Sequence, residues 1–126
     1  MWSLRFRAMD LDALTGQVAA VSDRYAARHG FVRDDAWYLL KLQEEVGELT
    51  QAHLRRTGQA RTKGLSAEQV EAGFRAELAD VLCHVLLLAR HHGVDLAAEV
   101  DRKWLVRLST ADGRLPTDGE PAAEGS

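Results

Sequence analysis

Cysteine, proline and long apolar runs are scarce in this sequence, and each scarcity narrows what the chain can be. The single cysteine, Cys83, excludes a disulfide within the chain and fits a reducing compartment, so we expect a cytoplasmic protein. Both prolines follow Leu115, so no proline interrupts a helix before that point. The most apolar run, VLCHVLLLA, is too short to span a bilayer, and the opening MWSLRFRAMD lacks the apolar core of a signal peptide. We therefore expect no membrane partner.

An excess of positive charge and the common nucleotide-binding loops are lacking as well. The net charge of -3 argues against non-specific binding of nucleic acid, which depends on neutralising phosphates, so no nucleic-acid partner is expected. Neither a P-loop nor a Gly-x-Gly-x-x-Gly motif occurs, which excludes nucleotide binding by those two routes. The 126 residues, of which 46% are hydrophobic, suit one domain with a packed core.

Strand signals are absent, and the spacing of apolar residues predicts an all-α fold instead. Four helices are expected, at about residues 11–28, 35–56, 67–92 and 95–108. Asp34 or Asp35 is the expected N-cap of the second helix, and SAEQ from Ser66 has the spacing of a capping box before the third. Glycines that follow basic residues predict C-terminal caps at Gly30, Gly58 and Gly93. The helical domain is expected to span residues 1–109, and residues 110–126, rich in Gly, Pro, Asp and Glu, are expected to be a disordered tail.

The third predicted helix is apolar around nearly its whole circumference. A helix of this kind is buried on nearly all sides, and a chain this small has little material with which to enclose it. A second copy of the chain would supply the missing cover, which predicts a homodimer or a dimer of dimers. The alternative is that the other three helices are enough.

Paired carboxylates are the most informative feature of the second and third predicted helices. Glu45 and Glu48 are separated by three positions and so share a helix face, and Glu77 and Asp80 repeat that spacing where they interrupt an apolar helix. If the two helices pack antiparallel, all four carboxylates can converge.

Convergence of four carboxylates is costly without a cation. Two unit charges about 5 Å apart repel by roughly 3 kcal/mol at an effective dielectric constant of about 20. The acids are therefore solvated and apart, or partly protonated, or gathered around a cation. If a cation is bound, an all-oxygen site favours Mg²⁺, Mn²⁺ or Ca²⁺ over zinc. The alternative for EEVGE alone is a solvated helix face. His84, one turn after Asp80, could hydrogen-bond one of these ligands or be a core histidine satisfied by a neighbour, and Cys83 is expected to be a small core residue.

The segment EEVGE at residues 44–48, followed by ELAD at residues 77–80, resembles the EExxE…ExxD signature of the MazG-like all-α nucleoside triphosphate pyrophosphatases. The resemblance covers about residues 36–107. It implies a helical bundle of four to five helices completed by oligomerisation. It also implies hydrolysis of a nucleoside triphosphate between the α and β phosphates, with Mg²⁺ as cofactor and Mn²⁺ as a possible substitute. The products would be a nucleoside monophosphate and pyrophosphate, which is a role compatible with cleansing the nucleotide pool.

The resemblance also assigns residues to roles. It makes Glu45, Glu48, Glu77 and Asp80 the metal ligands, and it places Glu44 and Glu45 in the catalytic step, with Glu44 orienting water or accepting a hydrogen bond from it. It makes Lys103 and Arg107 the residues that hold the triphosphate, although KWLVRLS departs from the text that usually follows this lysine in the family.

Recognition of the base would fall to aromatic residues. Trp37 is the expected substrate-binding aromatic, with Phe31 and Trp104 as further stacking candidates, and the alternative for each tryptophan is a place in the core. Phosphoribosyl-ATP pyrophosphatase is an alternative activity on the same fold. A non-catalytic, metal-stabilised dimerisation module is the alternative from another class of function.

Overall fold

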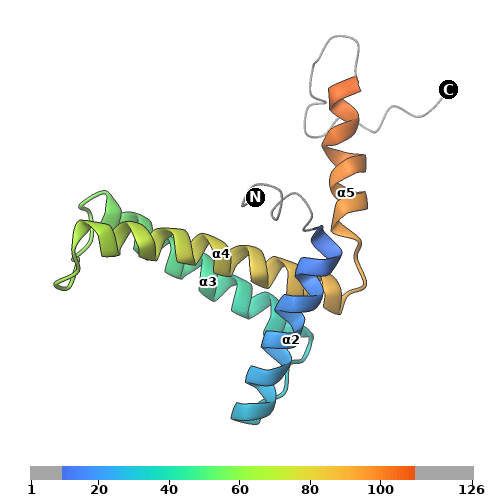
Figure 1. Cartoon of the computed structure of the whole chain (residues 1–126), viewed down its shortest axis with the longest axis horizontal. Coiled ribbons are helices and arrows are strands. Elements are labelled where there is room, and N and C mark those ends of the chain that lie inside the picture. The colour runs from blue at the N-terminus through green and yellow to red at the C-terminus, as the bar shows by residue number, and fades with distance from the viewer. Residues whose placement is uncertain (1–9, 110–126) are drawn as a thin grey trace, which may run out of the picture. The chain divides into compact units, whose positions relative to one another are not determined.

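The computed structural model describes residues 10–109, and every regular element within them is helical (Figure 1). In chain order the elements are α2 (Leu11–His29), α3 (Asp35–Arg56), α4 (Ala67–His91), α5 (Leu96–Lys103) and the short 3-10 helix η1 (Leu105–Ser109). The prediction of an all-α chain is confirmed. The chain divides after Val94 into two compact units, of which the first holds α2, α3 and α4 and the second holds α5 and η1. The tail predicted for residues 110–126 lies outside the described residues.

Capping side chains set the helix boundaries close to where the sequence places them. Asp34 caps α3 by accepting a hydrogen bond from the Trp37 amide, and Ser66 and Gln69 form the reciprocal capping box that starts α4. The α2 helix ends at Gly30, whose φ of 67° is the left-handed conformation that glycine adopts without a steric penalty. These local signals fix the bounds of the three helices of the first unit.

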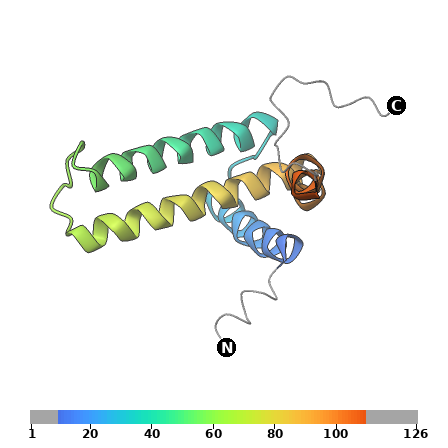
Figure 2. The same cartoon turned by 90° about the horizontal axis from the view of Figure 1, so that it is seen from above.

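The first unit is built around α4, which packs against both α3 and α2. The α3 and α4 helices run antiparallel and side by side, joined by the loop at residues 57–66, and α2 crosses α4 in its C-terminal half (Figures 1 and 2). Ala19, Tyr38 and Leu87, one from each helix, form a small buried cluster. Burial of these apolar side chains holds the three helices together.

The cover over α4 is incomplete within the described residues. Leu86 is 1% exposed, whereas Leu82 and Leu78, which lie on the same face of the helix one and two turns earlier, are each 49% exposed. Because Val70 near the start of α4 is also buried, the open part of the helix lies around its middle.

The second unit differs from its prediction in one respect. The helix expected over residues 95–108 ends at Lys103, and the chain continues as the 3-10 helix η1, in which the Arg107 amide bonds to the carbonyl of Trp104 three residues earlier. None of the helices in the described part of the chain is both long enough and apolar enough to cross a membrane.

Candidate metal centre and adjoining pocket

Three carboxylates from the two antiparallel helices converge midway along the first unit. Glu45 of α3 and Glu77 and Asp80 of α4 each place one oxygen so that the three atoms lie within 4.8 Å of one another. These residues are called the acidic cluster below. Glu45 and Glu77 are partly buried, and Asp80 is exposed. The donors are all oxygen and one side of the cluster is open to solvent, which is the chemistry that Mg²⁺ or Mn²⁺ takes in proteins.

Glu77 is the member of the cluster whose charge is least favoured. Burial raises the pKa of the Glu77 carboxyl, and the negative charges of Asp80, Glu45 and Glu48 raise it further. Its Oε2 atom is buried and has no hydrogen-bond partner among the described residues. A buried oxygen without a partner is costly, and a cation within the cluster would remove that cost. The residues present therefore fit a divalent ion.

Two nitrogen groups lie against Glu45. Lys41 Nζ is 3.7 Å from Glu45 Oε1 and 3.3 Å from Glu44 Oε1, and His84 Nε2 is 3.9 Å from Glu45 Oε1. Burial lowers the pKa of His84, with the Glu45 charge opposing that shift and the Lys41 charge adding to it. The imidazole is thus held toward its neutral form, and the lysine is the fixed positive charge beside Glu45.

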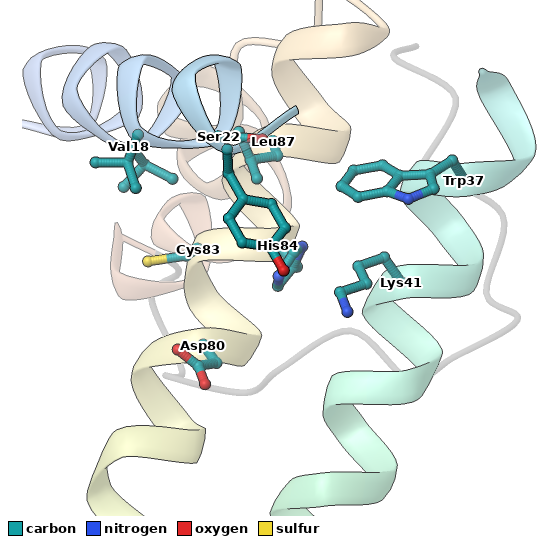
Figure 3. A pocket seen from close by; sticks show the side chains of 10 residues that line it. Val18, Ser22, Trp37, Lys41, Asp80, Cys83, His84 and Leu87 are labelled. Atoms are coloured by element: carbon teal, nitrogen blue, oxygen red, sulfur yellow. The ribbon is translucent and has the colours of Figure 1, made fainter. Parts of the chain in front are cut away.

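A pocket of about 390 Å³ adjoins the acidic cluster and is lined by residues of all three helices of the first unit. The lining residues are Val18, Val21, Ser22, Tyr25, Trp37, Lys41, Asp80, Cys83, His84 and Leu87. Figure 3 shows Trp37 and Lys41 extending from α3 toward α4, with His84 facing them and Asp80 one turn below. We call this space the three-helix pocket. Asp80 belongs both to its lining and to the acidic cluster, so the pocket and the cluster are continuous.

The aromatic side chain predicted to bind substrate is part of this pocket. Trp37 is partly buried and packs against Tyr38 with ring centroids 5.0 Å apart and against Phe31 at 5.6 Å. The indole ring thus contacts two other aromatic rings and also forms part of the pocket wall. Trp37 therefore packs against the core and also lines the pocket, and its stacking on a substrate base stays a prediction.

Other predicted residues lie around or apart from the cluster. Glu48 is exposed and is not one of the three clustered acids, although its charge reaches Glu77. Glu44 is exposed and pairs with Lys41. Lys103 and Arg107 belong to the second unit, where the Arg107 guanidinium lies 5.5 Å from the centre of the Trp104 ring.

The interpretation of His84 as a satisfied core residue is wrong. Its Nδ1 is buried with no hydrogen-bond partner in the described part of the chain, and the ring lines the three-helix pocket. Cys83 also lines the pocket, and burial together with the Asp80 charge raises the pKa of its thiol, so the thiol stays protonated. Both side chains line the pocket because α2, α3 and α4 leave a space between them.

Sequence reasoning missed two contributors to the site. Lys41 lies one helical turn before Glu45, so the four-residue spacing alone places both on one face of α3. The α2 side chains Val18, Ser22 and Tyr25 form a wall of the pocket, and no motif in α2 marks them.

Comparison of the chain with models of known families, with curated proteins and with solved structures finds no match.

Proposed function

We propose that the chain is a Mg²⁺-dependent nucleoside triphosphate pyrophosphohydrolase of the MazG-like type. The observation that carries this proposal is the continuity of the acidic cluster with a pocket that has an aromatic wall. Oxygen donors suit a cation that accompanies phosphates, and a pocket of about 390 Å³ is within the size range of small-ligand sites. A nucleotide offers a ring for the pocket and phosphates for the cluster.

The proposal gives each residue a role in binding or proton transfer. Glu45, Glu77 and Asp80 would hold Mg²⁺ or Mn²⁺, with Glu48 beside them. When bound, the ion neutralises the triphosphate and lowers the pKa of coordinated water. Glu44 and Glu45, on the α3 side of the cluster, are the carboxylates proposed to accept the proton of the attacking water.

The nucleoside is proposed to lie in the three-helix pocket against Trp37. Stacking on an indole ring discriminates weakly between bases, because every base offers an aromatic face. Lys103 and Arg107 remain proposed contacts to the departing pyrophosphate, since compact positive charge suits phosphate oxygens.

A product assay tests the proposal. The purified chain is incubated with the common ribo- and deoxyribonucleoside triphosphates and with phosphoribosyl-ATP, in Mg²⁺ and in EDTA, and the products are separated by ion-exchange chromatography. We expect monophosphate and pyrophosphate from at least one substrate in Mg²⁺ and none in EDTA. Hydrolysis of phosphoribosyl-ATP alone would assign the chain to that related activity. A diphosphate product would refute the reaction type.

A pair of glutamines on one helix provides the control. Glu77→Gln removes a member of the acidic cluster, and Glu68→Gln removes a carboxylate from the first turn of α4, outside both cluster and pocket. We expect pyrophosphate release to fall by orders of magnitude in the first variant and to be unchanged in the second. Absence of turnover in the parent, together with a rise in melting temperature in Mg²⁺, would favour the metal-stabilised dimerisation module instead.

We further propose that the chain is a homodimer or a dimer of dimers. The half-exposed Leu78 and Leu82 on α4 support self-association, because the sequence pattern of this helix is that of a buried one.

A further inference from the structure

Lys41 lies between the three-helix pocket and the acidic cluster, which together make up the proposed site. It lies one helical turn after Trp37 and one turn before Glu45, on the same face of α3. Among the described residues that line the three-helix pocket it is the only lysine or arginine, and Figure 3 shows its side chain extending from α3 toward the space that faces α4. A ligand with its ring on Trp37 and its charged end at the acidic cluster must pass this ammonium group.

The bonds that Lys41 makes within the described residues leave part of its capacity unused. An ammonium group has three N–H donors, and two carboxylate oxygens lie within 4 Å of Nζ, at 3.3 Å and 3.7 Å. Both distances exceed the roughly 2.7–2.9 Å of a short charge-assisted hydrogen bond. The side chain is 31% exposed, so a ligand in the pocket can approach it.

The negative charge of the acidic cluster disfavours the approach of a phosphate, and a cation at the position of Lys41 would offset this repulsion. Glu45, Glu77 and Asp80 repel an incoming phosphate, and the proposed divalent ion offsets their charge only at the cluster itself. The phosphate that joins the nucleoside to the rest of the ligand lies between the ring and the cluster. A positive charge beside that phosphate adds attraction along the approach.

We propose that Lys41 binds the phosphate group attached to the nucleoside and thereby makes the three-helix pocket selective for nucleotides over nucleosides. This inference rests on the proposed function for the identity of the ligand. It differs from that proposal in assigning the nucleoside-proximal phosphate to α3, whereas Lys103 and Arg107 are assigned to the pyrophosphate. The competing explanation is that Lys41 only forms helix-surface ion pairs with Glu44 and Glu45.

Binding of reaction products separates these explanations without depending on turnover. Isothermal titration calorimetry in Mg²⁺ compares AMP, GMP, CMP and UMP with the corresponding nucleosides, using the parent and Lys41→Met. We expect the parent to prefer monophosphate over nucleoside, and we expect Lys41→Met to lose about ten-fold of that preference while its nucleoside affinity is unchanged. Lys41→Arg should retain the preference, because a guanidinium also binds phosphate.

The matched control removes a cation elsewhere in the same unit. Arg75 on α4 is exposed and pairs with Glu71 at 3.5 Å, and Arg75→Met changes the net charge as Lys41→Met does. We expect Arg75→Met to keep the full preference for monophosphate. Circular dichroism checks that both variants fold, and Lys41→Gln replaces Lys41→Met if the latter does not.

Each outcome supports or overturns the inference. An equal loss of affinity for monophosphate and nucleoside in Lys41→Met would mean that Lys41 only shapes the pocket, and the inference would be wrong. Pyrophosphate release by the parent together with an unchanged preference in Lys41→Met would reject the inference and leave the proposed function standing. A selective loss of monophosphate binding in a chain that hydrolyses no triphosphate would support Lys41 and reject the hydrolase.

Discussion

At the scale of single residues, Glu77 is the carboxylate whose surroundings oppose its charge most. It is partly buried, its Oε2 has no hydrogen-bond partner in residues 10–109, and burial together with the charges of three other acids raises its pKa. Folding brings these charges together, whereas the unfolded chain keeps them apart. The acidic cluster therefore destabilises the chain unless a cation joins it.

Replacement of Glu77 by glutamine should stabilise the chain in EDTA. Because folding raises the pKa of Glu77 above its ordinary value of 4.5, the folded parent binds more protons than the unfolded chain, and its stability falls as pH rises through this range. Glu77→Gln lacks this loss, so at pH 7 we expect it to be more stable than the parent by about 1 kcal/mol. Thermal melts in EDTA between pH 4 and pH 8 measure the difference. A variant less stable than the parent at pH 7 would contradict the expected repulsion.

Glu48 and Glu44 are distinguished by a second pair of variants. Glu48→Gln should be at least as stable as the parent in EDTA, since its charge adds to the repulsion on Glu77. In excess Mg²⁺ the difference in stability between Glu48→Gln and the parent should narrow or reverse. Pyrophosphate release should fall by orders of magnitude in this variant if Glu48 joins the metal ligands. Glu44→Gln should show weaker effects, because Glu44 is exposed and faces Lys41. Full activity in Glu48→Gln would make Glu48 a surface residue.

Some of these residues were predictable and others were not. Glu77 and Asp80 stand out because charged residues interrupt an apolar helix, and the three-residue spacing places them on one face. The pocket roles of Cys83 and His84 were not predictable, because they depend on where α2 crosses α4. Spacing within one helix says nothing about a helix that approaches from elsewhere in the chain.

At the scale of elements, side-chain contacts join α3 to α4 near both ends of the helix pair. Where α3 begins and α4 ends, His91 bonds to Asp35 and stacks on Tyr38 with ring centroids 4.3 Å apart. At the other end, Arg56 Nε bonds to Glu71 at 2.7 Å. In the register that the two helices adopt, Glu45 lies opposite Glu77 and Asp80.

The Asp35–His91 bond should make part of the stability depend on acid pH. The hydrogen bond from His91 lowers the pKa of Asp35 below its ordinary value of 3.8, and the positive charge of His91 adds to the effect. A carboxyl whose pKa is lowered by folding contributes stability above 3.8, and that contribution is lost as pH falls through the folded value. Asp35→Asn should therefore melt below the parent at pH 5, with the gap closing toward pH 2. Asp12→Asn on α2 is the control, and a gap that persists at pH 2 would contradict this account.

The bounds of the elements show what local sequence determines. Caps and apolar spacing predicted α2, α3 and α4 closely, because Asp34, the Ser66 capping box and Gly30 act through bonds to their own helix ends. The same signals predicted the start of the last helix at Asp95 and missed its end, since no glycine or proline marks Lys103. A change from α to 3-10 geometry leaves no breaker residue in the sequence.

At the scale of the whole molecule, the single chain leaves much apolar surface in water. On α4 the exposed pair is Leu78 and Leu82, and on α3 Leu39 and Val46 are 50% and 40% exposed and lie two turns apart on one face. In the second unit, Leu108 is 83% exposed. Surface of this kind favours association, and a second copy is the proposed partner.

Two substitutions on the same face of α4 separate association from folding. Leu82 is 49% exposed in the single chain, whereas Leu86, one turn later, is 1% exposed. Leu86→Glu places an unpaired charge in the core and should unfold the chain. Leu82→Glu should leave the helical content intact, because its charge can reach water, and it should reduce the assembly to the 13.9 kDa chain, because that charge would be buried only against a second copy. Light scattering and circular dichroism at micromolar concentration measure both effects. If the parent chain is already a monomer, the proposed assembly is wrong. If Leu82→Glu remains an intact oligomer, the interface lies on another face.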